Sequence, residues 1–530
     1  MKEYIFTNGF VLNTKQKRFT EQSVLVQKNR ITNIGTLQDC KLQAKSAYTI
    51  IDLKRGLLLP AFIDAHTHFV EYAKGRILVN LSPCNTIDDI YNYLIAYRAK
   101  LSHQPQWILG YGWNRNILAH PEQLNCQFLD ALYPDIPVAL MSKDYHSKLC
   151  NSLALKIAGI DSNTPNPAGG LIERNNTGEL TGILLEKASE LIDPYIIYPD
   201  DKLLIQALAD TVETIYPMGL IGFNSMESIE SRDLMLKTHL QGKKFRFCWH
   251  FYCEDYEKVL QEGKKSYEGD EFYKLGGLKL FGDGSLGSQT AAMFTNYPSG
   301  GNGILRYSDE ELYSTMRCAA ENGYSTTIHA IGNRCVKQVI DCALRLKATR
   351  RFDQLFQRIE HIQAIRNEDI PLLQRSGLFA SLQPIHIAND VPLIEKHWKE
   401  SKEQAYSLKS IISAGIPYAF GSDAPVETIN PFPGIYCALE RRTNNNPALA
   451  QFRPEQSLTA IEAILGYTLG AAKSSKSEKE RGSVETGKLA DLIVIRDYRN
   501  SPASFWLEAK SELTMLDGEI VWQEDFTDNN

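Results

Sequence analysis

Short apolar runs alternate with helical patterns along the middle of the chain, and this alternation constrains the fold more than any other feature. Eight runs can be counted: GLLLPAFIDAH (56–66), GLIGFNSM (219–226), KFRFCWHFY (244–252), GGLKLFGDG (276–284), YSTTIHAIG (324–332), QRIEHIQ (357–363), GLFASLQP (377–384) and GIPYAFGSD (415–423). Such alternation is typical of parallel strands joined by helical crossovers. Eight units predict an α/β fold, a (β/α)8 TIM barrel over residues 57–481.

The two ends of the chain read differently from its middle. Strand-like segments occur at the start, YIFTNGFVLN (4–13) and SVLVQKNRITNIG (23–35), and near the end, LADLIVIRDY (489–498) and SELTMLDGEIVWQ (511–523). Asn8-Gly9 and Asp517-Gly518 indicate turns. Neither end is long enough to form a stable sheet alone. We therefore expect residues 1–56 and 482–530 to combine into one small β-sandwich domain.

The segment from about residue 72 to 200 is too long for a single barrel crossover, which needs only about a dozen residues. We therefore expect an insertion after the first barrel strand, with secondary structure of its own. The stretch TGILLEKASELI (181–192) within it reads as a helix.

Side chains that bind metals fall at or near the ends of five of the eight runs. His66 and His68 close the first run, and side chains two positions apart in a strand point the same way. The others are Lys279 in the fourth run and His329, His361 and Asp423 at the ends of the fifth, sixth and eighth. Because barrel strands end at one mouth, these groups should converge. Imidazoles and a carboxylate suit Zn²⁺ or a similar ion, whereas an ammonium would repel it.

Composition excludes several classes of protein. The 530 residues are 43% hydrophobic and 23% charged, which is ordinary for a soluble globular protein. A net charge of -6 without long blocks of one sign argues against nucleic-acid binding. Ten scattered cysteines without a C-x-x-C pair suit reduced thiols, and neither a secretory leader nor a membrane helix is apparent. We expect a cytoplasmic protein with a small-molecule substrate, without membrane partners, and a homodimer as its assembly.

The ligand pattern resembles that of the amidohydrolase superfamily, in which HxH, Lys, His, His and Asp lie on strands one, four, five, six and eight. The amidohydrolase 3 branch, which includes N-substituted formamide deformylases, is more similar still. The resemblance runs from about residue 57 to 495, through PAFIDAHTHF, GYGWNRN, DYHSKLCNSLAL, LKLFGDGSLGSQTAAM, TIHAIGNR, RIEHIQ, SLQPIH, GSDAPVETINPFPGIYCA and GKLADLIVI. At position 333 this chain has Asn where the branch often has Asp. We expect this difference to affect, at most, residues that contact the metal ligands and not the ligands themselves.

The resemblance implies one or two divalent metal ions, most commonly Zn²⁺, held by His66, His68, Lys279, His329, His361 and Asp423. It makes Lys279 the carrier of a CO2-derived carbamate that bridges two metals. That chemistry requires a deprotonated amine, which burial beside cations would promote. The alternatives are that Lys279 only pairs with Asp283 or Asp423, and that the site holds a single metal.

Catalytic roles follow from the same resemblance. Asp423 would accept a proton from the attacking water and pass it to the leaving nitrogen. His146 in DYHSKLCN is the candidate catalytic group that contacts the substrate and its oxyanion, with a structural hydrogen bond as the alternative. Trp113 is a candidate pocket wall, although tryptophans more often serve packing.

The loop GDGSLGS (282–288) contributes two further candidates for substrate contact, Asp283 and Ser285. It lacks the spacing of phosphate-binding loops, and a glycine turn without a chemical role is the alternative. Glu360 should face the opposite side of its strand from His361, so we expect it to be structural.

We therefore expect water activated by a metal to attack an amide-type C–N bond of a small molecule, such as an N-substituted formamide or an N-acyl amine. A deaminase or an esterase would use the same parts. A barrel without catalytic activity is a further alternative, against which the presence of all six ligand positions argues.

Overall fold

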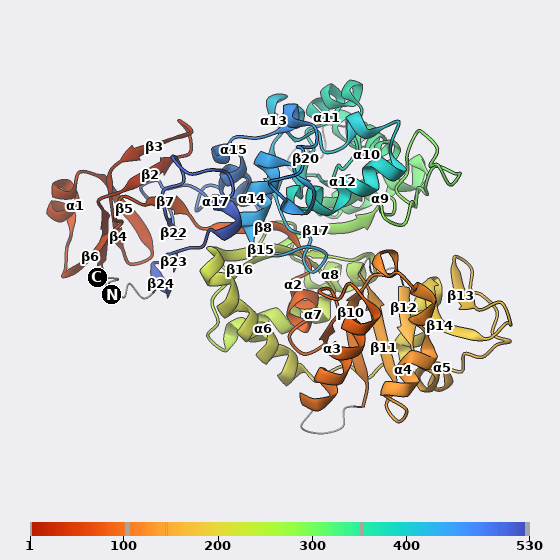
Figure 1. The fold of residues 1–530 in the computed structure, drawn as a ribbon. Coiled ribbons are helices and arrows are strands. Elements are labelled where there is room, and N and C mark those ends of the chain that lie inside the picture. Colours follow the sequence, from red (N-terminus) through yellow and green to blue (C-terminus); the bar gives the residue numbers. More distant parts are fainter. Residues whose placement is uncertain (1–2, 101–105, 144, 146, 350–354, 525–530) are drawn as a thin grey trace. The chain divides into compact units, whose positions relative to one another are not determined.

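The computed structural model describes residues 3–100, 106–143, 145, 147–349 and 355–524 (Figure 1). Contacts divide the chain into two compact units. We call Met1–Phe69 with Val212–Asn530 the barrel unit, and Val70–Thr211 the insertion unit. No helix among the described residues is both long and apolar enough to cross a membrane.

Eight parallel strands form the centre of the barrel unit. Each pairs with the next in chain order, and an isolated parallel bridge between Thr67 and Ala424 joins the two ends of the sheet, so the barrel is nearly closed. The strands are β8 (Phe62–Thr67), β15 (Leu220–Glu227), β16 (Arg246–Phe251), β17 (Tyr273–Phe281), β18 (Thr326–Ala330), β19 (Arg358–His361), β20 (Phe379–Leu382) and β21 (Tyr418–Phe420). Each of the eight predicted runs overlaps one of these strands, which confirms the TIM barrel.

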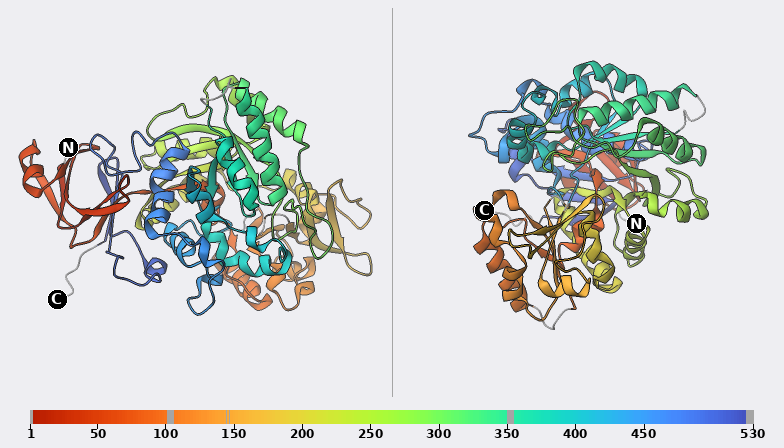
Figure 2. Two further views of the ribbon diagram at one scale, coloured as in Figure 1. Left: turned by 90° about the horizontal axis from the view of Figure 1, so that it is seen from above. Right: turned by 90° about the vertical axis from the view of Figure 1, so that its right-hand side faces the viewer.

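Helices follow the strands and surround the barrel (Figures 1 and 2). In α10 the residues Val336, Val339, Ile340 and Ala343 are buried, which gives the helix one apolar face toward the sheet. The helices of this region are α7 (Ile229–Leu240), α8 (Tyr256–Glu262), α9 (Asp309–Glu321), α10 (Asn333–Ala348), α11 (Ile370–Ser376), α12 (Ile387–His397), α13 (Leu408–Ser413), α14 (Pro431–Glu440), α15 (Ala460–Leu465) and α16 (Ala471–Ser474).

Strands from both ends of the chain lie in two further sheets of the barrel unit. One has the order β5-β4-β1-β6 and the other β24-β23-β22-β7-β2-β3. Their bounds are β1 (Glu3–Thr7), β2 (Phe10–Asn13), β3 (Arg18–Glu21), β4 (Ser23–Gln27), β5 (Arg30–Gly35), β6 (Tyr48–Asp52), β7 (Leu57–Pro60), β22 (Leu492–Ile495), β23 (Leu513–Leu516) and β24 (Glu519–Gln523). Helix α1 (Leu37–Gln43) packs on the first sheet, and α17 (Phe505–Glu508) packs on α14. Strands from both ends of the chain thus lie in one sheet, where β7 pairs with β2 on one side and with β22 on the other.

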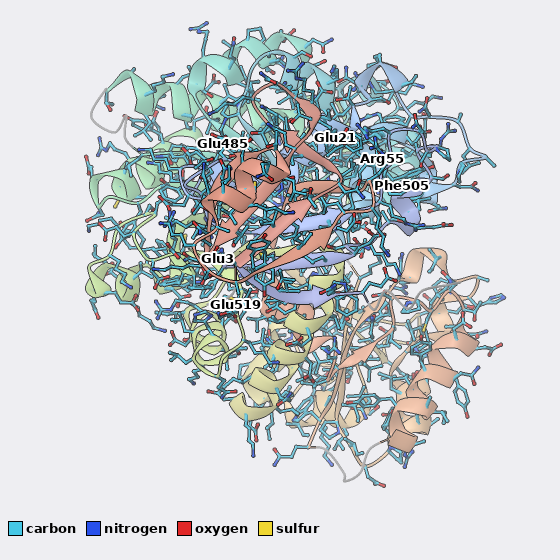
Figure 3. The ribbon with its side chains drawn as sticks, turned by 90° about the vertical axis from the view of Figure 1, so that its left-hand side faces the viewer. Glu3, Glu21, Arg55, Glu485, Phe505 and Glu519 are labelled. Atoms are coloured by element: carbon cyan, nitrogen blue, oxygen red, sulfur yellow. The ribbon has the colours of Figure 1, made fainter. Side chains whose placement is uncertain are left out.

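The two terminal sheets share one hydrophobic cluster. Phe6 and Val26 of the first sheet are buried in it together with Leu58 and Leu492 of the second. Figure 3 shows Glu21 and Arg55 from the start of the chain close together, and Glu485 and Glu519 from its end beside the same sheets. A separate β-sandwich domain stays a prediction, because these strands belong to the same unit as the barrel.

Three local predictions need refinement at the chain ends. The run GLLLPAFIDAH holds two strands, because β7 pairs with β2 and β22 while β8 enters the barrel. The terminal sheet therefore extends to Pro60, beyond the expected boundary at residue 56. The turn at Asn8-Gly9 links strands of two different sheets, whereas the turn at Asp517-Gly518 joins β23 and β24 as an antiparallel hairpin.

The insertion unit has a sheet of its own, in the order β13-β14-β12-β11-β10-β9. Its elements are β9 (Val79–Asn80), β10 (Ile108–Trp113), β11 (Val138–Ser142), β12 (Ser147–Cys150), β13 (Gly170–Arg174) and β14 (Leu180–Glu186), with α2 (Phe69–Lys74), α3 (Ile87–Lys100), α4 (Cys126–Leu132), α5 (Ser152–Ile157) and α6 (Asp201–Ile215). α2 and α6 each extend into the barrel unit at the boundary.

The helix predicted over residues 181–192 is wrong. Its first half is β14, which pairs with β12 and β13, and its second half begins a 3-10 helix (Lys187–Tyr195). Gly182 explains the difference, because it has a φ of +90° and an added Cβ would lie 2.4 Å from the carbonyl oxygen of Cys150. Neither the conformation nor the close approach suits an α-helix.

Candidate metal centre

The predicted ligands come from five barrel strands and meet at the carboxyl ends of those strands. His66 lies near the end of β8, Lys279 near the end of β17 and His361 at the end of β19. His329 lies in β18, and Asp423 follows β21. Ligand atoms of His66, His361 and Asp423 all lie within 4.8 Å of one another.

The two histidines of the first strand both face Asp423. Nε2 of His66 lies 3.3 Å from Asp423 Oδ1, and Nε2 of His68 lies 3.5 Å from the same oxygen. Their other ring nitrogens have partners: His66 Nδ1 is 2.6 Å from Glu360 Oε2, and His68 Nδ1 is 2.8 Å from the Met226 carbonyl. Both histidines therefore present Nε2 to the centre.

His329 and His361 complete the ring of imidazoles. Their ring centroids are 4.5 Å apart, and the ring of His361 is 4.9 Å from that of His66. Burial, followed by the charge of Lys279, lowers the pKa of His329 to about 3. Burial also holds the pKa of His361 well below its ordinary value. Neutral imidazole is the form that binds metals.

Lys279 is buried, with 2% of its surface exposed, and its Nζ lies 5.1 Å from the centre of the Phe281 ring. Burial lowers its pKa to about 8, although Glu360 and Asp423 act in the opposite direction. The carboxylates proposed as alternative partners face other groups among the described residues: Asp283 faces His329, and Asp423 faces His66, His68 and His386. The amine therefore deprotonates more readily than an exposed lysine does.

Asp423 is placed by close contact between β8 and the end of β21. Its backbone N–H donates to the His66 carbonyl at 2.8 Å. Asp64 accepts from the backbone N–H groups of His66 and Ser422 and so joins the same two segments. Gly421 permits this approach, since an added Cβ would lie 2.4 Å from the backbone nitrogen of His66.

These residues fit a divalent metal ion. His66 Nε2 and His361 Nδ1 are buried without a hydrogen-bond partner, which is costly unless another group satisfies them. The imidazoles converge with a carboxylate whose pKa is held well below its ordinary value, because the surrounding imidazoles outweigh the effect of burial. Nitrogen and carboxylate donors of this kind are the usual set for Zn²⁺ and similar ions.

Comparison with known proteins identifies the family. Residues 49–522 match the family model described as the amidohydrolase family, Amidohydro_3. The chain belongs to the amidohydrolase family. It is a hydrolase that acts on carbon–nitrogen bonds other than peptide bonds.

Similar proteins cover nearly the whole of this amidohydrolase. YtcJ of Bacillus subtilis (strain 168) is 30% identical over 534 residues, 98% of this chain and 99% of its own. The N-substituted formamide deformylase of Arthrobacter pascens is 25% identical over 550 residues, 99% of both chains. A solved metal-dependent hydrolase of Pyrococcus furiosus has the same fold, with a TM-score of 0.75 at 22% identity, covering 93% of this chain and 99% of its own.

Asp283 and Ser285, two residues predicted to contact the substrate, follow strand β17 in the barrel unit. Asp283 is 1% exposed and accepts hydrogen bonds from the backbone N–H groups of Ala292, Ile331 and Gly332, which indicates that it holds loops together. Ser285 is half-buried, and its Oγ lies 2.8 Å from that of Ser288. A contact of either residue with substrate stays a prediction.

The two remaining candidates, Trp113 and His146, belong to the insertion unit. Trp113 is buried in the hydrophobic core of that unit, and its indole N–H donates to the Leu140 carbonyl at 2.8 Å. This placement favours the packing alternative. His146 lies outside the described residues.

Two groups beside the ligands were not predicted to lie at the centre: Glu360 was expected to be structural, and His386 was given no role. Glu360 faces the barrel interior and contacts His66, although strand alternation placed it on the other side from His361. His386, in a 3-10 turn (Pro384–His386) after β20, has Nε2 3.5 Å from Asp423 Oδ2 and Nδ1 3.7 Å from Glu427 Oε1. Its position after the seventh strand was the available signal, since barrel residues there face the same mouth.

Proposed function

We propose that this amidohydrolase uses Zn²⁺ to hydrolyse an amide-type C–N bond of a small molecule, an N-substituted formamide or an N-acyl amine. The observation that carries the proposal is the convergence of His66, His361 and Asp423 within 4.8 Å, with His68, Lys279 and His329 around them. The substrate class is supported by the similarity to N-substituted formamide deformylase along nearly the whole chain.

The six ligand residues would hold one or two ions, with Lys279 as a bridging carbamate if two are present. Carbamate formation joins the Nζ of neutral Lys279 to CO2 and releases one proton. A low pKa of the buried amine supports this step. A bound ion would supply a water nucleophile ionised near neutral pH and would polarise the substrate carbonyl.

Asp423 is the proposed carrier of the proton. Its Oδ1 faces the two histidines of β8, whereas Oδ2 faces His386. Oδ2 is thus the atom to take a proton from water and to deliver it to the leaving nitrogen. Burial would lower the pKa of His386, but Asp423 and Glu427 raise it to about 10. His386 is accordingly a second candidate, beside His146, for a group that faces the substrate.

A hydrolysis screen tests the proposal. Zinc-loaded protein is offered N-formyl and N-acyl amines, matched carboxylic esters and amino-substituted heterocycles, with chelator-treated protein and His361→Ala as controls. We expect turnover of the amides that is lost in both controls. Preferential release of ammonia from the heterocycles would indicate a deaminase, and faster cleavage of esters an esterase. Absence of turnover in every class would favour the barrel without catalytic activity.

We further propose a cytoplasmic location and a homodimeric assembly. The absence of C-x-x-C pairs among the ten cysteines and the ordinary composition support the first. Cell fractionation tests the location, and light scattering on purified protein tests the assembly. A monomer at micromolar concentration would contradict the dimer.

A further inference from the structure

A buried ion pair lies in the barrel interior next to the candidate metal centre. Arg358 and Glu360 are both 0% exposed, and Arg358 Nε donates to Glu360 Oε1 at 2.9 Å. Arg358 Nη2 reaches Glu360 Oε2 at 3.3 Å and donates to the Ala65 carbonyl at 2.7 Å. The arginine thus holds both the glutamate and the residue that precedes His66.

Glu360 in turn holds His66. Its Oε2 lies 2.6 Å from His66 Nδ1, which is the shortest of the contacts in this chain of groups. A carboxylate that is paired with arginine stays ionised and can only accept hydrogen bonds. The proton of neutral His66 therefore lies on Nδ1, and the lone pair lies on Nε2, the nitrogen that is buried without a hydrogen-bond partner and faces Asp423.

The backbone explains how one strand supplies both the ion pair and a ligand. Arg358 and Glu360 are two residues apart in β19 and point to the same, interior face. His361 would then point outward, but its φ of +71° breaks the alternation and leaves its ring 4.9 Å from that of His66. β19 therefore contributes both Glu360, which contacts His66, and His361, which is itself a candidate ligand.

We propose that Arg358 and Glu360 are positioning residues that fix the tautomer and orientation of His66 for metal binding. The inference rests on the proposed metal centre. Partners of ligating histidines typically change metal affinity by 10- to 100-fold. The competing interpretation is that the pair only fills the barrel interior and contributes to stability alone.

The barrel unit offers a matched control. Arg246 and Asp491 form another buried pair, both 3% exposed, with contacts of 2.8 Å between each carboxylate oxygen and the guanidinium. Arg246 is the first residue of β16, at the amino end of the barrel, and this pair contacts none of the candidate ligands. Asp491→Asn thus removes a buried paired carboxylate away from the centre.

The experiment compares wild type, Glu360→Gln and Asp491→Asn. Zinc dissociation constants are measured by competition with a coloured chelator, the thermal midpoint of the metal-free protein is recorded, and visible spectra are taken after Co²⁺ loading. We expect Glu360→Gln to weaken zinc binding by about 10- to 100-fold and to change the Co²⁺ spectrum. Asp491→Asn should keep its zinc dissociation constant within twofold of wild type and leave the Co²⁺ spectrum unchanged. This should hold even if its thermal midpoint falls as much as that of Glu360→Gln.

Each outcome decides between the interpretations. Equal zinc affinity in Glu360→Gln and wild type would overturn the proposal, as would an equal loss in both variants. If Glu360→Gln does not fold, Glu360→Asp replaces it, because its shorter carboxylate cannot hold Arg358 and His66 at once; unchanged affinity there would also overturn the proposal. Wild-type protein that binds no zinc would instead refute the metal centre itself, irrespective of Glu360.

Discussion

His361 and Asp423 both have a backbone conformation that residues other than glycine rarely adopt, with φ of +71° and +59°. Each such residue costs on the order of 1–3 kcal/mol and persists only where its surroundings hold it, commonly at functional sites. Here the conformation turns His361 toward the ring of His66 and places Asp423 next to His66 and His68. The strain is therefore linked to the convergence of the ligands.

Replacing Asp423 with Asn tests its role as proton carrier. Asn tolerates positive φ as well as Asp does, so the backbone should keep its course and the amide oxygen should keep much of the metal. We expect kcat to fall by about 10²- to 10⁴-fold or more, with a much smaller change in KM. Zinc content and kcat are measured on the same preparation. A near-normal rate at full occupancy would refute the proton-carrying role.

Lys279→Ala tests the bridging carbamate. Loss of the amine should abolish activity, and bicarbonate together with a short carboxylic acid should partly restore it, since a free carboxylate can occupy the position of the bridge. The assay records activity and metal content with and without these additives. Full metal content with normal turnover in the unsupplemented variant would show that the lysine is structural.

At the scale of the elements, the contact between β8 and the end of β21 is the junction on which the site depends. Asp64 accepts from backbone N–H groups on both sides of it, and Gly421 allows the two segments to approach. Period-two alternation predicted the strands correctly, but it could not show Glu360 facing the interior. The alternation fails at His361, whose φ departs from ordinary strand geometry, so that His361 reaches the centre although Glu360, its neighbour in the strand, also faces the interior.

Gly421→Ala tests this junction. The added Cβ would lie 2.4 Å from the His66 nitrogen and 2.7 Å from Asp64 Oδ1, so β8 must shift. We expect a loss of about 1–3 kcal/mol in the free energy of unfolding and weaker zinc binding. Gly287→Ala is the control, because its nearest atom would be 3.9 Å away. Urea unfolding and zinc titration that leave both variants like wild type would contradict the junction's importance.

At the scale of the whole molecule, the sequence was sufficient to predict the barrel, whereas the metal-binding role of the six candidate ligands stays a prediction. The barrel strands are largely buried runs, and the candidate ligands lie at or near the ends of five of them. The helix expected over residues 181–192 failed because sheet pairing and Gly182 override local helical patterns. His386 was not predicted, because its partners, Asp423 and Glu427, are distant from it in sequence.

Leu492→Ala tests the contribution of the terminal sheets. Leu492 in β22 is fully buried in the cluster shared by the two sheets, and β22 lies between strands from the two ends of the chain. We expect the free energy of unfolding to fall by about 2–5 kcal/mol, with zinc content and kcat per folded molecule unchanged. A parallel loss of zinc in folded protein would show that the terminal sheets also support the site.

The metal content of purified protein tests the central claim most directly. Wild type and His361→Ala are produced in zinc-supplemented cultures, purified without chelators and analysed for all divalent metals per chain. The convergence of His66, His361 and Asp423 predicts one or two ions per wild-type chain, most commonly zinc, and a clear loss in the variant. A sub-stoichiometric trace in wild type, or equal metal in the two proteins, would contradict the account.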